Sequence, residues 1–182
     1  MPLILTLAMS VGLLLSPLVL HEMGHWIVMR RYGVAVREVW LGLGPKLFSF
    51  GSFRICAFPI GAALSPDIET YTKLPPRARM HIALGGPVAS LFSAVVLFAA
   101  WQAADDRVLH EGLGQLALLN LFIAALNILP IPPLDGFQAW VAYRESNGKV
   151  LSEKTKRWSQ RIGTGVIYGF GFFYFANFIL WP

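Results

Sequence analysis

Two histidines and a glutamate lie close together near the start of the chain, in the segment HEMGH at residues 21–25. Histidines at positions i and i+4 share one face of a helix, so His21 and His25 can offer two imidazole nitrogens to one zinc ion. Glu22 lies about 100° around the helix from His21 and can act as a general base towards a water molecule at the same site. The segment therefore predicts the catalytic centre of a zinc hydrolase.

A third zinc ligand is needed, because catalytic zinc usually has three protein ligands and one open position. The continuation that metzincins require is absent, since Val28 and Arg31 occupy its glycine and histidine positions. Glu38 is nearer in the sequence, but it lies beyond the expected end of the helix in a basic loop. We interpret Glu38 as a solvated charge.

Asp135 is the remaining candidate, near the end of the segment LNILPIPPLDG at residues 126–136. Its prolines must end or unwind a helix, and an extended segment at membrane depth is tolerated where it lines a cavity. Taken alone, the pattern is more typical of a helix-ending turn with a capping aspartate. Beside the HEMGH segment, we favour Asp135 as the third ligand.

The elements that must position these residues are membrane helices. The chain is 55% hydrophobic and 14% charged, whereas soluble domains carry about 25% charged residues. A helix crosses a bilayer with about 20 apolar residues, and four stretches approach or exceed that length. We therefore expect an all-α polytopic membrane protein that forms a single domain over residues 1–182, with transmembrane helices at about 3–29, 82–101, 113–129 and 162–181.

The basic residues indicate how these spans are oriented. Eight of the fifteen Lys and Arg residues fall in loop 30–80 and six in loop 144–161, while loop 102–112 holds only Arg107. Because basic loops stay cytoplasmic, we expect a multi-pass protein of the cell membrane with both termini on the non-cytoplasmic side. Basic loops can also bind nucleic acid, but this alternation favours contact with membrane lipid and no nucleic acid.

A β-hairpin is predicted between the first two spans, at about residues 46–58. Two aromatic and β-branched runs flank Gly51-Ser52, which is typical of a hairpin turn, and we expect Pro59 to interrupt further pairing. The hairpin is apolar, so it either dips into the membrane or packs beneath the helices. Its edge could accept an extended substrate as an added strand.

Three segments, in the order HEMGH, GGPVAS (85–90) and NILPIPPLDG (127–136), resemble motifs of the site-2 protease family of intramembrane zinc metalloproteases. The last matches the pattern Asn-x-x-Pro-x-Pro-x-Leu-Asp-Gly, in which the aspartate is a zinc ligand. The resemblance covers most of residues 15–140. It implies one zinc ion per chain and assigns its ligands and the catalytic base to His21, His25, Asp135 and Glu22.

The resemblance also implies regulated intramembrane proteolysis, in which peptide bonds of a transmembrane substrate protein are hydrolysed near the cytoplasmic face. Gly86 and Pro87 in the second motif are candidates for substrate binding, and close helix packing is an equally good interpretation of that motif. Asn127 could bind the substrate backbone, although packing is the simpler interpretation there. His21 and His25 precede Arg30 by nine and five residues, which places the site about 8–14 Å inside the cytoplasmic end.

The chain departs from the family pattern in three places. Ser90 stands where relatives often have asparagine, Ala62 and Ala63 follow the Pro-x-Gly element, and the short loop 102–112 has no room for a PDZ domain. A membrane transporter or metal-handling protein is an alternative function, but transporters usually show inverted repeats, which are not visible here. A catalytically inactive, partner-binding homologue is another alternative, for which we would expect Glu22 or a ligand to be lost.

Overall fold

The structure is a computed structural model that describes the backbone of residues 3–180. Side chains are described except at positions 1–12, 14, 43, 58–60, 167, 168 and 170–182. Over the described backbone the chain forms α1 (Leu3–Arg31), β1 (Val36–Phe50), β2 (Phe53–Pro66), α2 (Ile68–Lys73), α3 (Pro76–Gln102), α4 (Arg107–Asn127), α5 (Asp135–Ser146) and α6 (Glu153–Leu180).

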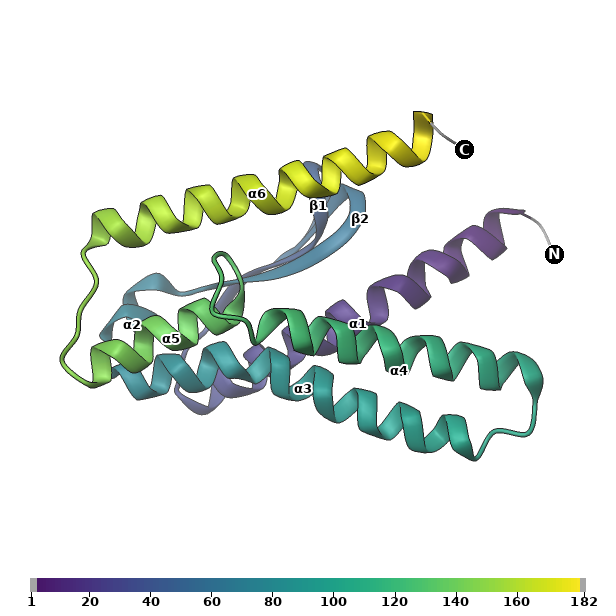
Figure 1. Cartoon of the computed structure of the whole chain (residues 1–182), viewed down its shortest axis with the longest axis horizontal. Coiled ribbons are helices and arrows are strands. Elements are labelled where there is room, and N and C mark those ends of the chain that lie inside the picture. The colour runs from purple at the N-terminus through teal and green to yellow at the C-terminus, as the bar shows by residue number, and fades with distance from the viewer. Residues whose placement is uncertain (1–2, 181–182) are drawn as a thin grey trace.

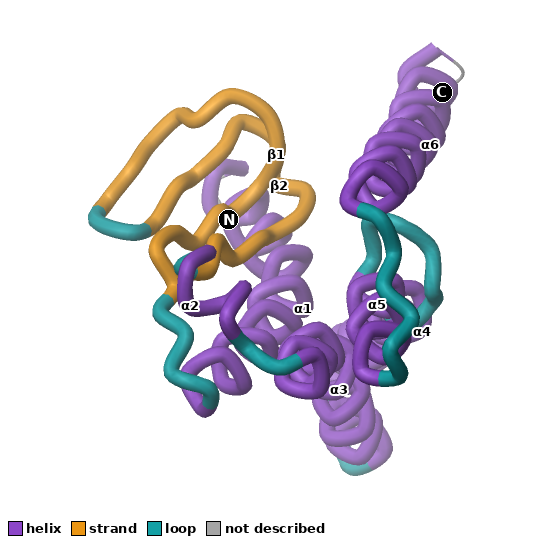
Figure 2. The backbone as a smooth tube through the Cα atoms, turned by 90° about the vertical axis from the view of Figure 1, so that its left-hand side faces the viewer, coloured by secondary structure: helices purple, strands orange, loops and turns teal. Residues whose placement is uncertain are grey.

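Helix α3 is the centre of the helical part, because it packs against α1, α4 and α5. Figure 1 shows α3 and α4 lying side by side, with the sheet and α6 on the opposite side of the molecule. In the turned view of Figure 2, the sheet lies beside α1 while α6 stands apart from it. Helices α1, α3 and α5 carry the residues of interest.

Small residues allow α1 and α3 to approach closely. A Cβ atom added at Gly85 would lie 2.7 Å from the carbonyl oxygen of Gly24, so neither position has room for a larger side chain. Close backbone approach at small residues is the usual way in which helices associate in lipid. Gly85 thus serves helix packing, which is one of the two interpretations of that segment.

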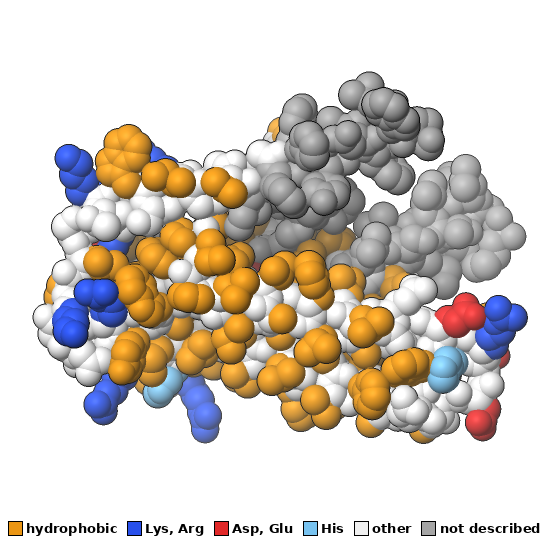
Figure 3. All heavy atoms as spheres, viewed as in Figure 1, with side chains coloured by type: hydrophobic (Ala, Val, Ile, Leu, Met, Phe, Trp, Pro, Cys, Tyr) orange, Lys and Arg blue, Asp and Glu red, His pale blue; other side chains and the backbone are white. Residues whose placement is uncertain are grey.

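Helices α3 and α4 are long and apolar enough to cross a membrane, and among the described residues they are the two that meet this test. They coincide with the second and third predicted spans. Their outward side chains are apolar and strongly exposed, as Phe92 and Phe122 illustrate. Figure 3 shows hydrophobic side chains along this face, with charged side chains gathered at its two ends. Helices α1 and α6 overlap the first and fourth predicted spans, and much of their side-chain structure lies outside the described residues.

The hairpin turns at the expected place, with Gly51 at a φ of 54°, but its strands are longer than predicted. Strands β1 and β2 pair antiparallel and are bent. Residues 39–41 pair with 62–64 on one side and with 53–55 on the other, which leaves 62–66 at an edge. The expectation that Pro59 ends the pairing is wrong. Phe58 pairs with Leu43 and Ala62 pairs with Leu41, with a register shift between the two pairs. Pro59 therefore lies at an irregularity of the ladder, where a residue without a backbone N–H is tolerated.

Helix α5 was not predicted from the sequence. The proline-rich segment does end α4, but only as a short connection, and Asp135 is the first residue of the next helix. Gly136 packs against the connection so tightly that an added Cβ would collide with the carbonyl group of Ile128. The segment therefore turns back on itself and starts α5 directly beside α3, rather than remaining extended.

Glu145 joins three helices at one end of the molecule. Its carboxylate accepts hydrogen bonds from Arg79 of α3 at 2.7 Å and from Lys156 of α6 at 2.6 Å, and its side chain is only 8% exposed. Burial raises the pKa of Glu145, but the hydrogen bond from Lys156 and the two positive charges outweigh that effect and hold the pKa below its usual range. The ionised carboxylate thus stabilises the arrangement of α3, α5 and α6.

We predict that Glu145→Gln lowers the free energy of unfolding by about 2 kcal/mol at pH 7, the scale of hydrogen bonds to a charged group. Because the folded-state pKa is depressed, the stabilisation is present above the ordinary glutamate pKa and is lost as the pH falls through the folded value. Unfolding in detergent at neutral and acid pH should show the gap between the two proteins closing on acidification. Glu111→Gln, which removes an exposed ion pair with Arg107, is the control and should have little effect at either pH.

Candidate metal centre and active site

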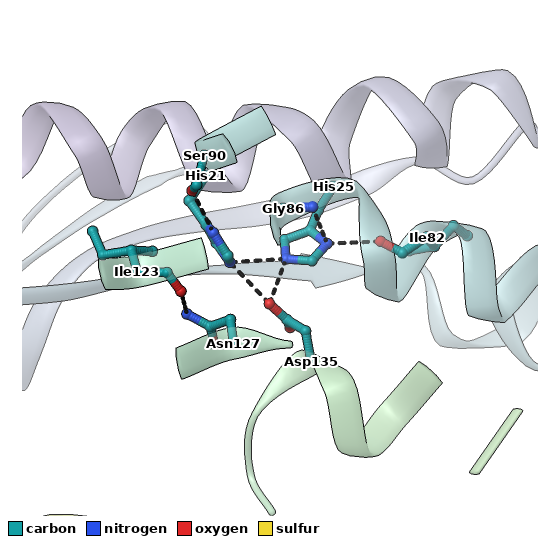
Figure 4. Close-up of polar contacts among 8 residues, drawn as sticks. All are labelled: His21, His25, Ile82, Gly86, Ser90, Ile123, Asn127 and Asp135. Atoms are coloured by element: carbon teal, nitrogen blue, oxygen red, sulfur yellow. Dashed lines mark hydrogen bonds and ion pairs between the residues drawn. The ribbon is translucent and has the colours of Figure 1, made fainter. Parts of the chain in front are cut away.

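Three side-chain atoms from two distant parts of the chain converge at one point. The Nε2 atom of His21 lies 2.9 Å from Oδ2 of Asp135, the Nε2 atom of His25 lies 3.2 Å from the same oxygen, and the two nitrogens are 3.3 Å apart. Figure 4 shows both imidazole rings reaching from α1 towards the carboxylate at the start of α5. The structure thus brings together the three residues that the sequence singled out as ligands.

The second nitrogen of each ring is held by α3. The Nδ1 atom of His25 lies 2.7 Å from the carbonyl oxygen of Ile82, and that of His21 lies 2.9 Å from Oγ of Ser90. The backbone nitrogen of Gly86 also lies 3.3 Å from this Nδ1 atom, but the contact with the carbonyl oxygen is much shorter. Because a carbonyl oxygen only accepts, we assign the proton of His25 to Nδ1, which leaves a lone pair on Nε2. Contacts of this kind orient metal-binding histidines. The sequence did not reveal Ile82 in this role, because a backbone carbonyl leaves no residue-type signal, and Ser90 was noted only as a departure from the family pattern.

This donor set fits a zinc ion. Two imidazole lone pairs and a carboxylate oxygen face one another in a largely buried place, where they repel one another unless a cation or a proton lies between them. Tetrahedral zinc with ligand bonds of about 2.0–2.2 Å separates its ligand atoms by about 3.3 Å. The three observed separations of 2.9, 3.2 and 3.3 Å are close to that value. His21, His25 and Asp135 therefore form a group that could hold a metal ion.

Glu22 lies in the wall of the same cavity, next to the two histidines on α1. Leu64, in the edge segment of β2, lines the same cavity. Glu22 is half-buried rather than enclosed. This position suits a group that must contact both a water molecule at the metal centre and a substrate entering from the sheet side.

The cavity has a volume of about 930 Å³ and extends well beyond the metal ligands. Helices α1, α3 and α5 contribute to its walls, the edge segment 61–66 of β2 forms part of one side, and the first turns of α6 form part of another. It is therefore large enough for a segment of polypeptide, not only for a small molecule.

The three candidates for substrate binding take different places. Asn127 lines the cavity, and its Nδ2 atom donates to the carbonyl oxygen of Ile123 at 3.0 Å. Gly86 lies directly behind the metal centre, where an added Cβ would fall on the Nε2 atoms of both histidines. Pro87 is buried inside α3 and is not among the residues of the cavity wall. Of these three, Asn127 is the one with access to the cavity.

A family model described as Peptidase family M50 matches residues 9–105 and 99–170, which together span most of the chain. The chain belongs to peptidase family M50. The match includes HEMGH, GGPVAS and the proline-rich segment with Asp135. The resemblance stated from these three segments is therefore confirmed at the level of the family.

Several family M50 relatives are named as zinc metalloproteases. A zinc metalloprotease of Methanocaldococcus jannaschii is 30% identical over 125 residues, which are 68% of this chain and 31% of the relative. Rip2 of Mycobacterium tuberculosis, whose name describes it as a zinc metalloprotease, is 35% identical over 138 residues, or 69% of this chain and 53% of Rip2. The chain thus matches about half or less of the length of these relatives.

The fold is also similar to that of a solved member. The structure of a site-2 protease from Methanocaldococcus jannaschii matches with a TM-score of 0.59 and 26% sequence identity, over 92% of this chain and 68% of that chain. The similarity extends over nearly all of the helices and the sheet. The mostly helical architecture of this chain is therefore that of a site-2 protease.

We predict that Gly86→Ala weakens zinc binding although it removes no ligand. The new methyl group would occupy the space of the two histidine Nε2 atoms and push the rings apart, which should lower zinc affinity about tenfold or more. Competition with a fluorescent chelator measures this affinity. Gly112→Ala is the matched control, because a Cβ atom there meets nothing within 4 Å. Equal zinc affinity in the two variants would contradict the placement of Gly86 behind the site.

Proposed function

We propose that the protein is an intramembrane zinc metalloprotease that hydrolyses peptide bonds of transmembrane substrate proteins near the cytoplasmic face. The observation that carries this proposal is the convergence of His21, His25 and Asp135 beside Glu22, in a cavity walled by helix α3, a candidate membrane span. Membership of family M50 supports zinc and proteolysis.

His21, His25 and Asp135 would hold the ion through Nε2, Nε2 and Oδ2. Zinc bound there supplies a Lewis acid that activates water and polarises the scissile carbonyl. Glu22 takes the proton from the attacking water and passes it to the leaving amine. Ser90 and the carbonyl of Ile82 keep the two imidazole rings in orientation through their Nδ1 atoms.

The distribution of basic and acidic residues at the helix ends supports a placement in the membrane. Basic residues lie at the C-terminal end of α1 (Arg30), at the N-terminal end of α3 (Arg79) and at the C-terminal end of α5 (Arg144). The loop that joins the C-terminal end of α3 to the N-terminal end of α4 instead carries Asp105 and Asp106. We place the basic end in the cytoplasm, with α1, α3, α4 and α6 as four spans and both termini outside. The large cavity lets water from the cytoplasmic side reach the site.

The edge segment of β2 is the place where we expect an extended substrate to bind. Residues 62–66 form an edge of the sheet, and Leu64 lines the same cavity as Glu22. A substrate segment added to this edge as a strand would be extended rather than helical, and its peptide bonds would lie beside the metal centre. Asn127, on the far wall, would bind the substrate backbone through its amide.

Glu22→Gln is predicted to abolish cleavage of a transmembrane substrate while zinc remains bound, because the amide cannot accept the proton from water. Loss of a general base typically lowers the rate by about two to four orders of magnitude. Purified zinc-loaded protein and a reconstituted substrate provide the assay, with Glu111→Gln as the control for a lost carboxylate far from the site. Undiminished cleavage by Glu22→Gln would end the assignment as a hydrolase of this type.

Asp135→Ala is predicted to lose tight zinc binding, since only two ligands remain. Zinc content after dialysis should fall from one ion per chain in the unmodified protein to well below one in the variant, whereas Glu22→Gln should retain the ion. Zinc retained at full affinity by Asp135→Ala would remove this residue from the ligand set.

A further inference from the structure

A second, smaller cavity of about 360 Å³ lies at the end of α5. Its wall consists of Trp140, Tyr143, Arg144 and Asn147, which share one face of the helix, together with Lys149 just beyond it. The cavity shares no residue with the large cavity around the metal centre. The proteolytic site therefore does not account for it.

The helix end itself brings two positive charges together. Gly148 has a φ of 74°, its nitrogen donates to the carbonyl oxygen of Glu145 at 3.1 Å, and the nitrogen of Lys149 donates to that of Arg144 at 2.9 Å. This is the Schellman arrangement, in which the residue after the glycine folds back onto the last full turn. The side chains at these two positions are usually hydrophobic, but here they are a lysine and an arginine, and both line the cavity.

Nothing in the described part of the chain neutralises these two cations. Neither Arg144 nor Lys149 forms an ion pair among the described residues, and the Nε atom of Arg144 is buried there without a hydrogen-bond partner. The neighbouring carboxylate of Glu145 is occupied by Arg79 and Lys156. The cavity thus presents two positive charges that no described carboxylate neutralises, which suits an anion with several acceptor oxygens.

The rest of the wall suits an amphiphile. The guanidinium carbon of Arg144 lies 5.0 Å from the centre of the Trp140 ring, and Trp140 and Tyr143 are 37% and 57% exposed. The ion pair between Arg79 and Glu145 fixes this end of α5 beside the first turns of α3, the basic end of a candidate span. Aromatic side chains next to basic ones at that depth are typical of contact with lipid headgroups.

We propose that this cavity binds the phosphate of an anionic glycerophospholipid. Arg144 and Lys149 would hold the phosphate oxygens, and Trp140 and Tyr143 would lie against the glycerol and the first methylenes of the chains. The inference rests on the membrane orientation given under the proposed function and does not depend on catalysis.

The test uses the full chain in nanodiscs of phosphatidylcholine, with and without phosphatidylglycerol. The lipid that stays bound on transfer to detergent is counted by native mass spectrometry, and its affinity follows from titration. Arg144→Gln with Lys149→Gln should reduce the affinity for phosphatidylglycerol roughly tenfold to thirtyfold, as two lost cations imply. Lys149→Gln alone, at an exposed position outside the helix, should reduce it in part without affecting folding.

Lys154→Gln with Arg161→Gln is the matched control, because it removes the same charge from exposed positions on α6 that line neither cavity. This variant should retain the affinity of the unmodified protein. Equal losses in the two double variants would reduce the effect to net charge and overturn the proposal. Displacement of the lipid by equimolar inorganic phosphate, or by an acidic peptide, would also overturn it in favour of a general anion or protein site. Failure of the unmodified protein to float with vesicles would instead contradict its placement in the membrane and would overturn the lipid proposal with it, whatever the variants do.

Discussion

The close approach of two histidine nitrogens and a carboxylate oxygen is the constraint around which the structure is organised. Two imidazole nitrogens and a carboxylate oxygen lie within 3.3 Å of one another in the midst of apolar helices. Such a cluster is costly in hydrocarbon, and a divalent cation offsets that cost. To bring these atoms together, α1 and α5 must be held in a fixed position relative to α3.

Helix α3 provides that arrangement, although it contributes no ligand. Its glycines let α1 approach until Gly24 touches Gly85, and Gly86 leaves room for the two histidine rings. The carbonyl of Ile82 and the hydroxyl of Ser90 then meet the Nδ1 atoms of those rings. At the other end of α5, Glu145 joins this helix to α3 and α6, so the helix that starts at Asp135 is fixed at both of its ends.

Several elements could be predicted from local sequence alone. His21 and His25 share a face because of the helical repeat, the hairpin turns at Gly51-Ser52 because glycine tolerates a positive φ, and α4 ends before the prolines. The extent of the sheet could not be predicted in the same way. Pro59 argued for an early end, but the strand passes it at an irregularity and pairs with a different part of β1, and such long-range pairing has no local signal.

From the sequence by itself, HEMGH predicted two ligands of a zinc site, because residue type and helical spacing suffice for that, whereas Asp135 was favoured as the third ligand only beside HEMGH and by the family resemblance. The sequence also determined the family and the apolar character of the helices. Only the tertiary structure decided that Asp135 reaches the histidines from the first turn of a separate helix, that Ile82 and Ser90 orient the rings, and that Arg144 and Lys149 line one cavity. These contacts join residues that are far apart in the chain or meet through backbone atoms, and neither kind leaves a pattern in the sequence.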